Sequence, residues 1–582
     1  MKSQRENGGL LELTPDAIES LKGSPLFNDD LRPVPLANRT WNVWNIASLW
    51  VGMAVCIPTY QLASGLIDQG MNWWQAILTV FLGNGIVLIP MALIAFAGTK
   101  YGIPYPIFCR ASFGLNGAHL PSLLRAGVAC GWFGIQCWIG GQFLNVALVQ
   151  CFPPWERLDR QWVYSFDPSK NADTAMADAT KASEASIEAG LKLANLRAEF
   201  DRLRDAKDPG LQAREPELHE ATAAARSAQS KAAEAKRYLI SGALALSFFI
   251  FWLINVWIGY KGTESIKWME TWGSPILIGV GAVLIAWAVY VAGGLSSLLN
   301  ASTMTKGKEG FSFMNIFLPA LNGMIAFWST LALNIPDFTR YARSQKDQVL
   351  GQLIGLPTTM GFYAFVGVCG TLGAIVAFGE PIWDPSVLMA RFNSPVLSII
   401  GGFAIFLATI TTNIAANVVA PANAFSNLAP RAISFRMGVI ATGVVGLCIQ
   451  PWKLLADPSG YIFGWLGVYG SFLGPLAGLY LADYYIIRGQ RFNLKDLYNP
   501  IDGKYQFYHG VNLVAIIAYV LSVLPFLICW YFKLGGVGQL IQDNSWTVGL
   551  VLSLCFYSFL MHGKKDSLVS SEEFNRLTET AS

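Results

Sequence analysis

The chain has 582 residues, of which 53% are hydrophobic and only 14% are charged, about half the ~25% charged residues of a soluble globular protein. The formal net charge is only +3, and aromatic residues make up 13% of the chain. The high hydrophobic and low charged content excludes a soluble enzyme and a disordered chain. The small net charge excludes a nucleic-acid-binding protein, because it leaves no basic surface for phosphates. The composition is typical of a protein that crosses a membrane many times.

The first part of the chain, residues 1–40, is polar and has no apolar stretch followed by a cleavage site, so we predict a tail and no removable signal peptide. Apolar stretches long enough to span a bilayer then follow. We expect twelve, and therefore an all-α polytopic membrane protein. They cover residues 46–66, 74–97, 127–151, 238–259, 273–292, 314–335, 351–378, 396–420, 433–450, 461–487, 510–532 and 546–561.

The Lys and Arg content of the loops predicts the orientation of these spans. If the N-terminus is cytoplasmic, 22 Lys and Arg fall on the cytoplasmic side and five fall in the short outer loops. We therefore expect a multi-pass protein of the inner (plasma) membrane, with cytoplasmic tails at residues 1–40 and 563–582.

A charged segment, residues 155–237, interrupts the apolar chain between the third and fourth spans. It is rich in Ala, Glu, Lys and Arg and contains the helix-breaking sequence Asp208-Pro209-Gly210. This pattern predicts two amphipathic helices that form an extracytoplasmic hairpin. Two interpretations stay open: a solvated insertion with no function of its own, and an element that binds a protein partner or forms oligomers.

Two membrane segments of the chain are similar to each other. Residues 50–58 read WVGMAVCIP and residues 328–336 read WSTLALNIP, with Trp, Ala, Ile and Pro at the same offsets. Pro58 and Pro336 each remove a backbone donor late in the first and sixth spans, so we expect both helices to be interrupted there. Paired interruptions in two halves are typical of secondary transporters with inverted repeats. The alternatives are chance similarity and ordinary proline kinks.

This repeat predicts how the chain is divided. Spans 1–5 form a first inverted repeat over residues 41–300, which contains the insertion. Spans 6–10 form a second repeat over residues 301–490, and spans 11 and 12 follow over residues 491–562. An odd number of spans in each repeat forces the two halves to have opposite orientations in the membrane.

Polar side chains inside the apolar spans indicate where a site lies, because buried polarity is expensive in a membrane. In the third span, Trp132 and Gln136 are four residues apart and share one helix face. A flat indole and an amide suit a small planar ring with amide groups. A Trp packed between helices, with a Gln bonded to a neighbouring carbonyl, explains the same pattern without a ligand.

The eighth span places Ala408, Thr411 and Thr412 on one helix face. Two hydroxyls and nearby carbonyls can form a cage of neutral oxygens for a hard monovalent cation such as sodium. The alternative is that these threonines only bond back to the carbonyl four residues earlier. Because the third and eighth spans are third in each repeat, we expect their polar motifs and the two interruptions to form one site.

Carboxylates are missing from the middle of spans one, three, six and eight. Asp337 and Asp483 lie near predicted cytoplasmic ends, and Glu380 and Asp384 lie in an outer loop. Proton carriers usually need an ionisable group within the membrane, so the sequence favours sodium coupling over proton coupling. The nine cysteines form no CxxC pair and the four histidines are scattered, so we expect neither a disulfide framework nor a zinc site.

With these residues in place, the chain resembles the nucleobase:cation symporter-1 family. The likeness runs from about Arg39 to the twelfth span, with residues 155–237 as an insertion. It implies a leucine-transporter-like fold of five-plus-five inverted repeats with two added helices. It also implies import of heterocycles such as uracil, cytosine, allantoin or hydantoins, often with a cation. The strongest motifs are NIASLWVGM (45–53), NWWQA (72–76), GWFGIQCWIGG (131–141), TTNIAAN (411–417) and GPLAGLYLADYY (474–485).

The resemblance also implies roles for individual residues. Trp132 and Trp328 would hold the substrate ring between them, and Gln136 and Asn417 would bond to its amide edges. Cys56 stands where some members have a substrate-contacting Gln, which leaves the identity of the heterocycle open.

A sodium site is implied in the same way. Its ligands would be the carbonyl oxygens of Gly52, Val55 and Ala408 and the hydroxyls of Thr411 and Thr412. A further departure from the family pattern affects the ring pocket instead, because Phe327 precedes Trp328 where a small residue can occur.

The sequence therefore predicts a secondary active importer of a small planar heterocycle, with Na⁺ as coupling ion and no other cofactor. Alternatives are a proton-coupled importer of a similar or larger heterocycle such as thiamine, and a non-transporting membrane sensor or scaffold. A membrane enzyme would need a carboxylate pair or a His cluster at the membrane surface, and the sequence offers no convincing one. A channel would need rings of charged side chains along a repeated pore-lining segment, and the sequence shows no such segment.

Overall fold

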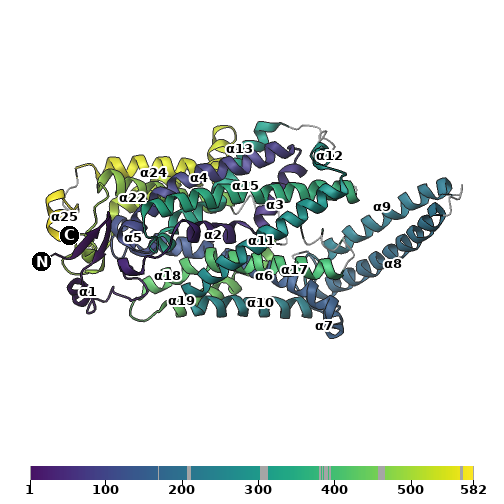
Figure 1. Ribbon diagram of the computed structural model, residues 1–582, viewed down its shortest axis with the longest axis horizontal. Helices are drawn as coiled ribbons and strands as arrows, with labels where there is room; N and C mark the ends of the chain where they lie inside the picture. The colour runs from purple at the N-terminus through teal and green to yellow at the C-terminus, as the bar shows by residue number, and fades with distance from the viewer. Residues whose placement is uncertain are drawn as a thin grey trace.

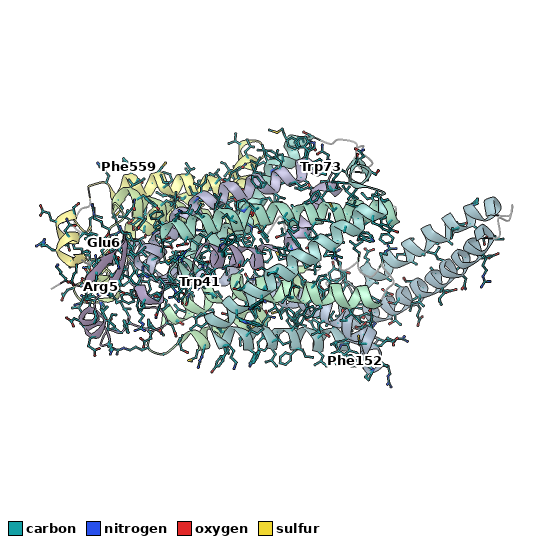
Figure 2. All side chains as sticks on the ribbon, viewed as in Figure 1. Arg5, Glu6, Trp41, Trp73, Phe152 and Phe559 are labelled. Atoms are coloured by element: carbon teal, nitrogen blue, oxygen red, sulfur yellow. The ribbon has the colours of Figure 1, made fainter. Side chains whose placement is uncertain are left out.

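A computed structural model describes residues 2–167, 169–205, 211–301, 312–378, 382, 385, 388, 391, 395–455, 466–563 and 568–580. The molecule is an elongated bundle of helices that run roughly along its long axis (Figure 1). Both chain termini lie at one end of the bundle, and a thin helical hairpin projects from the other end. Figure 2 shows Arg5 and Glu6 at the first end and Phe152 near the base of the hairpin.

The first half of the chain supplies the helices up to residue 300. They are α2 (Val43–Ala54), α3 (Ile57–Asp68), α4 (Trp73–Tyr101), α5 (Tyr105–Phe113), α6 (His119–Cys151), α7 (Pro153–Asp159), α10 (Gly242–Lys261), α11 (Thr263–Val291) and α12 (Leu295–Asn300). The insertion adds β3 (Trp162–Ser165), α8 (Ala172–Asp205), α9 (Leu211–Lys236) and β4 (Leu239–Ser241).

The second half supplies the remaining spans. They are α13 (Phe313–Asn334), α14 (Pro336–Thr339), α15 (Gln345–Phe378), α17 (Pro395–Asn417), α18 (Val419–Leu428), α19 (Phe435–Cys448), α20 (Pro451–Leu455), α21 (Leu466–Leu481) and the π-helix η4 (Ala482–Ile487). The C-terminal part contains η5 (Lys495–Tyr498), α22 (Leu513–Tyr531), α23 (Val537–Asp543), α24 (Ser545–Met561), α25 (Ser571–Leu577) and β5 (Thr578–Thr580).

The predicted all-α membrane protein is confirmed, and helix is found in all twelve predicted spans, apart from residues 461–465, which lie outside the described chain. Within the described residues, seven helices are long and apolar enough to cross a membrane, and two bent helix pairs raise this number to nine. The count of twelve therefore stays a prediction.

The interruption predicted in the first span is a sharp one. Helices α2 and α3 meet at an angle of 60° across Val55 and Cys56, and Pro58 lies in the first turn of α3. A proline is tolerated there because the first N–H groups of a helix have no partner within the helix. The chain therefore leaves α2 just before the proline, as predicted.

The interruption predicted in the sixth span is weaker and lies at the end of the helix. Helix α13 runs to Asn334, and Ile335 keeps helical angles (φ −54°, ψ −28°) before Pro336 begins α14. Pro336, like Pro58, occupies a first-turn position of the helix that follows, where its missing N–H costs no hydrogen bond. The two breaks differ before the proline: Val55 and Cys56 leave the helical angles, whereas Ile335 keeps them. The predicted interruption is therefore present at Pro336, but it is slight, whereas the interruption at Pro58 bends the chain by 60°.

The insertion folds into the predicted hairpin. Helices α8 and α9 pack against each other along their length, and the antiparallel pair β3–β4 closes the base of the hairpin. A small apolar cluster of Ala175, Ala179 and Leu239 lies where the hairpin meets this pair. The predicted break at Asp208-Pro209-Gly210 lies outside the described residues, as do Glu380 and Asp384 of the outer loop.

The N-terminal tail is folded and joins the C-terminal tail. Strands β1 (Gln4–Asn7) and β2 (Leu10–Leu13) are antiparallel, and β5 pairs in parallel with β1. The short helices α1 (Pro15–Leu21) and η1 (Leu36–Asn38) follow. Arg39 anchors this tail to the bundle by donating to the carbonyls of Val34 and Thr99, both at 2.9 Å. Burial lowers the pKa of Arg39 to about 10, so the side chain stays charged at neutral pH.

Close packing between α2 and α15 fixes the position of Trp50. A Cβ placed on Gly355 would lie only 2.6 Å from the Cβ of Trp50, so this approach requires glycine. Small residues allow membrane helices to approach each other in this way. Trp50 is fully buried as a result.

Candidate functional site

The end of α2 lies inside the bundle, where its last carbonyl groups need partners. The Val51 carbonyl accepts from Val55 N and the Ala54 carbonyl accepts from Cys56 N, both at 3.0 Å. The carbonyls of Gly52 and Met53, which lie between these two, bond to another helix instead. This helix end is therefore completed from outside its own chain segment.

The partners of these two carbonyls are threonine hydroxyls of α17. Thr412 Oγ1 lies 3.1 Å from the Gly52 carbonyl and 3.2 Å from the Met53 carbonyl. Thr411 Oγ1 lies 3.2 Å from the Gly52 carbonyl and 2.9 Å from the Ala408 carbonyl. The threonines therefore do more than bond back to their own helix, although Thr411 Oγ1 also lies 3.1 Å from the Leu407 carbonyl.

This oxygen cluster has more carbonyl oxygens than hydroxyl protons, although the Leu407 and Ala408 carbonyls also accept the helical N–H bonds of α17. Each hydroxyl carries a single proton, so Thr411 and Thr412 supply two protons for contacts with four different carbonyl oxygens. A monovalent cation would satisfy such a set of neutral oxygens. Val55, the remaining predicted ligand, packs beside Ala408 and Leu277. The structure thus brings the five predicted residues together, with Val55 joined to Ala408 through its side chain.

A chain of aromatic rings lies beside the same helix end. Trp50 of α2 meets Trp328 of α13 edge-on, with ring centroids 5.2 Å apart. Phe327 contacts both Trp328, at 4.9 Å, and Trp132 of α6, at 5.7 Å. The two predicted ring-holding tryptophans are therefore linked through Phe327. The hydroxyl of Tyr469 on α21 interacts with Trp132 and donates to the Ala326 carbonyl, which ties α21 to this group.

Several polar atoms among these residues are buried without a hydrogen-bond partner. They are the indole nitrogens of Trp50 and Trp328 and the carbonyl oxygen Oε1 of Gln136. An unpaired buried polar atom costs ~1–3 kcal/mol, so native proteins keep few of them without a reason. Two donors and one acceptor are thus available to a planar ligand with amide groups.

A relay of three asparagines sets the orientation of Asn417. Its Nδ2 donates to Oδ1 of Asn413 at 3.1 Å, and Asn413 Nδ2 donates to Oδ1 of Asn255 on α10 at 3.1 Å. Asn413 also lies 3.4 Å from the Phe133 carbonyl and 3.4 Å from the Cys137 sulfur. These two residues precede and follow Gln136 on α6 within one turn. Because Asn417 donates into the protein, its carbonyl oxygen is left for a ligand.

Cys56, the remaining predicted substrate contact, lies at the bend and is fully buried. Its sulfur lies 3.2 Å from the hydroxyl of Thr59 and also interacts with Thr412. Cys56 therefore touches the oxygen cluster directly and connects it to α3.

A buried arginine holds the helix ends on the side of the chain termini. Arg125 Nε lies 2.8 Å from the Thr330 carbonyl and 2.9 Å from Asn334 Oδ1, both on α13, and Arg125 Nη2 lies 3.0 Å from the Ala416 carbonyl of α17. A cation at two helix C-termini is favourable because both ends carry partial negative charge. Asp337 is buried beside this network and accepts from Asn334 Nδ2 at 3.3 Å.

Some of these residues were not predicted as parts of the site. Trp50 had a sequence signal, since it occupies the same place as Trp328 in the repeated segments. Asn413 lies within the TTNIAAN motif, but its partner Asn255 is a single polar residue in the fourth span. Arg125 lies before the third predicted span, so only the structure places its guanidinium inside the bundle.

Within the described residues, no group of three or more His, Cys, Asp or Glu side chains is placed to hold a metal ion.

Comparisons with known proteins agree on one family. A family model described as "Permease for cytosine/purines, uracil, thiamine, allantoin" matches residues 33–164 and 223–549, which leaves out most of the hairpin. The purine-uracil permease NCS1 of Arabidopsis thaliana is 35% identical over 95% of this chain and 81% of its own. The allantoin permease of Bacillus subtilis is 35% identical over 92% of this chain and 93% of its own.

Among solved structures, the chain is similar to Mhp1, a nucleobase-cation-symport-1 family transporter solved in a closed conformation with bromovinylhydantoin bound. The TM-score is 0.68 at 22% identity, over 95% of this chain and 99% of Mhp1. This similarity establishes the predicted leucine-transporter-like fold.

Replacing Arg125 by methionine should destabilise the folded protein, because two helix-end carbonyls (Thr330 and Ala416) and Asn334 Oδ1 lose their partner while the length of the side chain is kept. Breaking a buried charged network typically costs ~3–5 kcal/mol. We expect a clear fall in the apparent melting temperature of the detergent-purified protein. The matched control is Arg157→Met, on the exposed surface of α7, which should melt like the parent; equal melting of both variants would contradict the assigned role of Arg125.

Proposed function

Because the chain belongs to the nucleobase:cation symporter-1 family of permeases for cytosine/purines, uracil, thiamine and allantoin, we propose that it imports a small planar heterocycle together with Na⁺ by alternating access. Family membership makes the protein a multi-pass membrane transporter and not an enzyme. The coupling ion, the substrate contacts and the direction of transport are the parts that we propose.

One observation carries the proposal for sodium: the crowded oxygens at the end of α2. Two hydroxyl protons are shared among the carbonyls that surround them, and all of these oxygens are neutral, which suits a monovalent hard cation. A Na⁺ ion there would be held by Thr411, Thr412 and the carbonyls of Gly52, Val55 and Ala408. It would join α2 to α17 more firmly than the hydroxyls alone.

The substrate would lie among the aromatic rings next to this helix end. We place a heterocycle of the uracil, allantoin or hydantoin type between Trp132 and Trp328, with Phe327 moving aside or covering one edge. Gln136 Oε1 and Asn417 Oδ1 would accept from ring N–H groups. The unpaired indole N–H of Trp328 would donate to a ring carbonyl. A ligand that lacks a matching group would leave one of these atoms unpaired, at ~1–3 kcal/mol.

Transport would follow from rocking of one helix group against another. The moving group would contain the first, second, sixth and seventh spans (α2–α4, α13 and α15), and the other group would contain the third, fourth, eighth and ninth (α6, α10, α17 and α19). The oxygen cluster connects one group to the other, so an ion bound there acts on their relative position. One Na⁺ that moves inward across 100 mV supplies about 2.3 kcal/mol.

Proton coupling is the second candidate, and one observation favours it. Asp337 is a fully buried carboxylate that accepts hydrogen bonds from Tyr105 N at 3.0 Å and Asn423 Nδ2 at 2.9 Å. A carboxylate enclosed in this way is the kind of group that proton carriers use. Asp337 lies in α14, beyond the end of α13 and away from the ring pocket, which makes it the weaker candidate for coupling. Asp337→Asn should leave sodium-driven uptake largely unchanged if sodium is the coupling ion.

Loss of the Trp132 ring should weaken substrate binding. Aromatic stacking on a base is worth ~1–3 kcal/mol, so Trp132→Ala should raise the dissociation constant for the bound heterocycle roughly 5- to 150-fold. The ligand is whichever of uracil, cytosine, allantoin, hydantoin or thiamine raises the thermal stability of the parent protein. Trp44→Ala is the control, because the Trp44 side chain is 70% exposed. Equal affinity in the two variants would exclude the ring-holding role.

Removing one hydroxyl from the oxygen cluster should raise the sodium requirement. Thr412→Val keeps the shape of the side chain and removes a ligand worth ~1.5–3 kcal/mol for a charged partner, so the sodium concentration for half-maximal uptake should rise roughly 10- to 150-fold. Thr409→Val is a matched control on the same helix, because the Thr409 hydroxyl only donates to the Ile405 carbonyl at 2.7 Å. If both variants keep the parental sodium dependence, Thr412 does not bind the ion.

A further inference from the structure

A cavity lies at the end of the bundle that carries the chain termini, and none of the proposed substrate or sodium ligands lines it. It has a volume of about 400 Å³ and is enclosed by the N-terminal tail, the end of α10, the segment after α14 and the start of α19. Its charged lining residues are Asp29, Asp30, Arg32, Lys261, Arg340 and Arg436. Four of these six residues are basic, so the lining has an excess of two positive charges.

The two carboxylates of this cavity already have partners within the protein. Asp29 lies 3.6 Å from Arg32, and Asp30 Oδ2 accepts from Phe435 N at 2.9 Å, which caps α19. Among the described residues, Lys261, Arg340 and Arg436 form no ion pair. The buried Asp337 carboxylate attracts the Arg340 guanidinium without forming a contact ion pair, so the unbalanced positive charge of the cavity lies mainly on Lys261 and Arg436.

Arg340 is the buried member of this set. Its Nη1 donates to the Asp30 carbonyl at 3.0 Å and its Nη2 donates to the Tyr341 hydroxyl at 2.8 Å. The Arg340 side chain is only 5% exposed, and its Nε has no hydrogen-bond partner among the described residues. A buried guanidinium with an unused donor at the wall of a basic cavity is a feature of sites that bind phosphate or carboxylate groups.

The outer surfaces of α10 and α19 lead into this cavity. On α10, exposed apolar and aromatic side chains follow one helix face and end next to Lys261; they are Leu246, Phe249, Leu253, Trp257 and Tyr260. On α19, the exposed residues Met437, Ile440 and Val444 form a similar stripe that begins next to Arg436. The two helices pack together, since Trp252 Nε1 donates to the Gly443 carbonyl at 2.9 Å.

Aromatic side chains hold the basic groups at the boundary between these stripes and the cavity. The Lys261 ammonium lies 5.3 Å from the ring centroid of Trp257, and the Arg436 guanidinium lies 5.3 Å from that of Tyr260. Trp and Tyr are enriched where a protein meets lipid headgroups. The arrangement therefore has an apolar surface for acyl chains that ends at a positively charged recess.

We propose that this cavity binds the phosphate headgroup of an anionic phospholipid from the membrane leaflet on the side of the chain termini. Lys261 and Arg436 would contact the phosphate from the open side, and Arg340 would contact it from the buried side. The acyl chains would lie along the exposed faces of α10 and α19. The lipid, and not free phosphate, is the favoured source because both apolar stripes lead to the basic residues.

Because of the position of the cavity, a lipid bound there would affect transport. One side of its wall is formed by Arg340, which lies between α13 and α15 of the group proposed to move. The other side is formed by the ends of α10 and α19, which belong to the other group. A headgroup that bridges them would hold the two groups together on this side. Lipid binding itself does not depend on the proposed substrate or coupling ion.

Binding of phosphatidylglycerol to the full-length purified protein tests the proposal directly. Native mass spectrometry and thermal melting would be compared with added phosphatidylglycerol, with added phosphatidylcholine and with inorganic phosphate alone. We expect phosphatidylglycerol to bind and to raise the melting temperature, and the other two to do neither. The double variant K261A/R436A should need roughly 30-fold more phosphatidylglycerol for half-saturation.

The control variant is Lys346→Ala, an exposed lysine at the start of α15 that does not line the cavity, and it should bind like the parent. Equal binding of both lipids by the parent protein would overturn the proposal whether or not the double variant folds. An unchanged affinity of the double variant would also overturn it. Stabilisation by inorganic phosphate equal to that by phosphatidylglycerol would exclude the lipid as the ligand. Neither readout requires transport activity, so failure here is distinct from failure of the proposed symport.

Discussion

The structure depends on a helix that ends inside the membrane. Where α2 stops, the carbonyl groups of Gly52, Met53 and Ala54 lose the partners that a continuous helix would give them, and no water is present in a bilayer core to replace these partners. The Ala54 carbonyl is satisfied by the chain as it turns, and the other two are satisfied by threonines of α17. The bend therefore leaves carbonyl groups of α2 without helical partners. The contact with α17, in the second half of the chain, supplies hydrogen-bond donors to them.

The same contact explains why a binding site should form here. The bend places Trp50 against its repeat partner Trp328, and Phe327 carries the aromatic contact on to Trp132. The asparagine relay from α10 fixes which amide atom of Asn417 is free. Ring surface, unpaired polar atoms and the oxygen cluster are thus arranged around one helix end. A ligand and an ion at these places would each affect the position of α2, which is the physical basis for coupling them.

Local rules predicted part of this arrangement. Pro58 indicated the bend because proline restricts the residue before it, and helical periodicity placed Thr411 and Thr412 on one face. Contacts between distant segments were not predictable in this way. The asparagine relay needs α10 beside α17, and the tail sheet pairs Gln4 with Thr578. The sequence did not show that the break at Pro58 would be sharp and the break at Pro336 slight, because both prolines begin a helix and only the residues before them differ. The basic cavity likewise combines residues that only the fold brings together.

Linkage between ion and substrate tests the central claim most directly. If Na⁺ and the heterocycle both act on the end of α2, bound Na⁺ must increase the protein's affinity for the heterocycle, and bound heterocycle must increase its affinity for Na⁺ by the same factor. Titration of the purified protein with its heterocycle at several sodium concentrations, and with sodium at several heterocycle concentrations, would give both factors. We predict that the two factors are equal and about five or more, and that potassium in place of sodium does not increase the affinity for the heterocycle. A heterocycle affinity that is the same in sodium and in potassium would contradict this prediction.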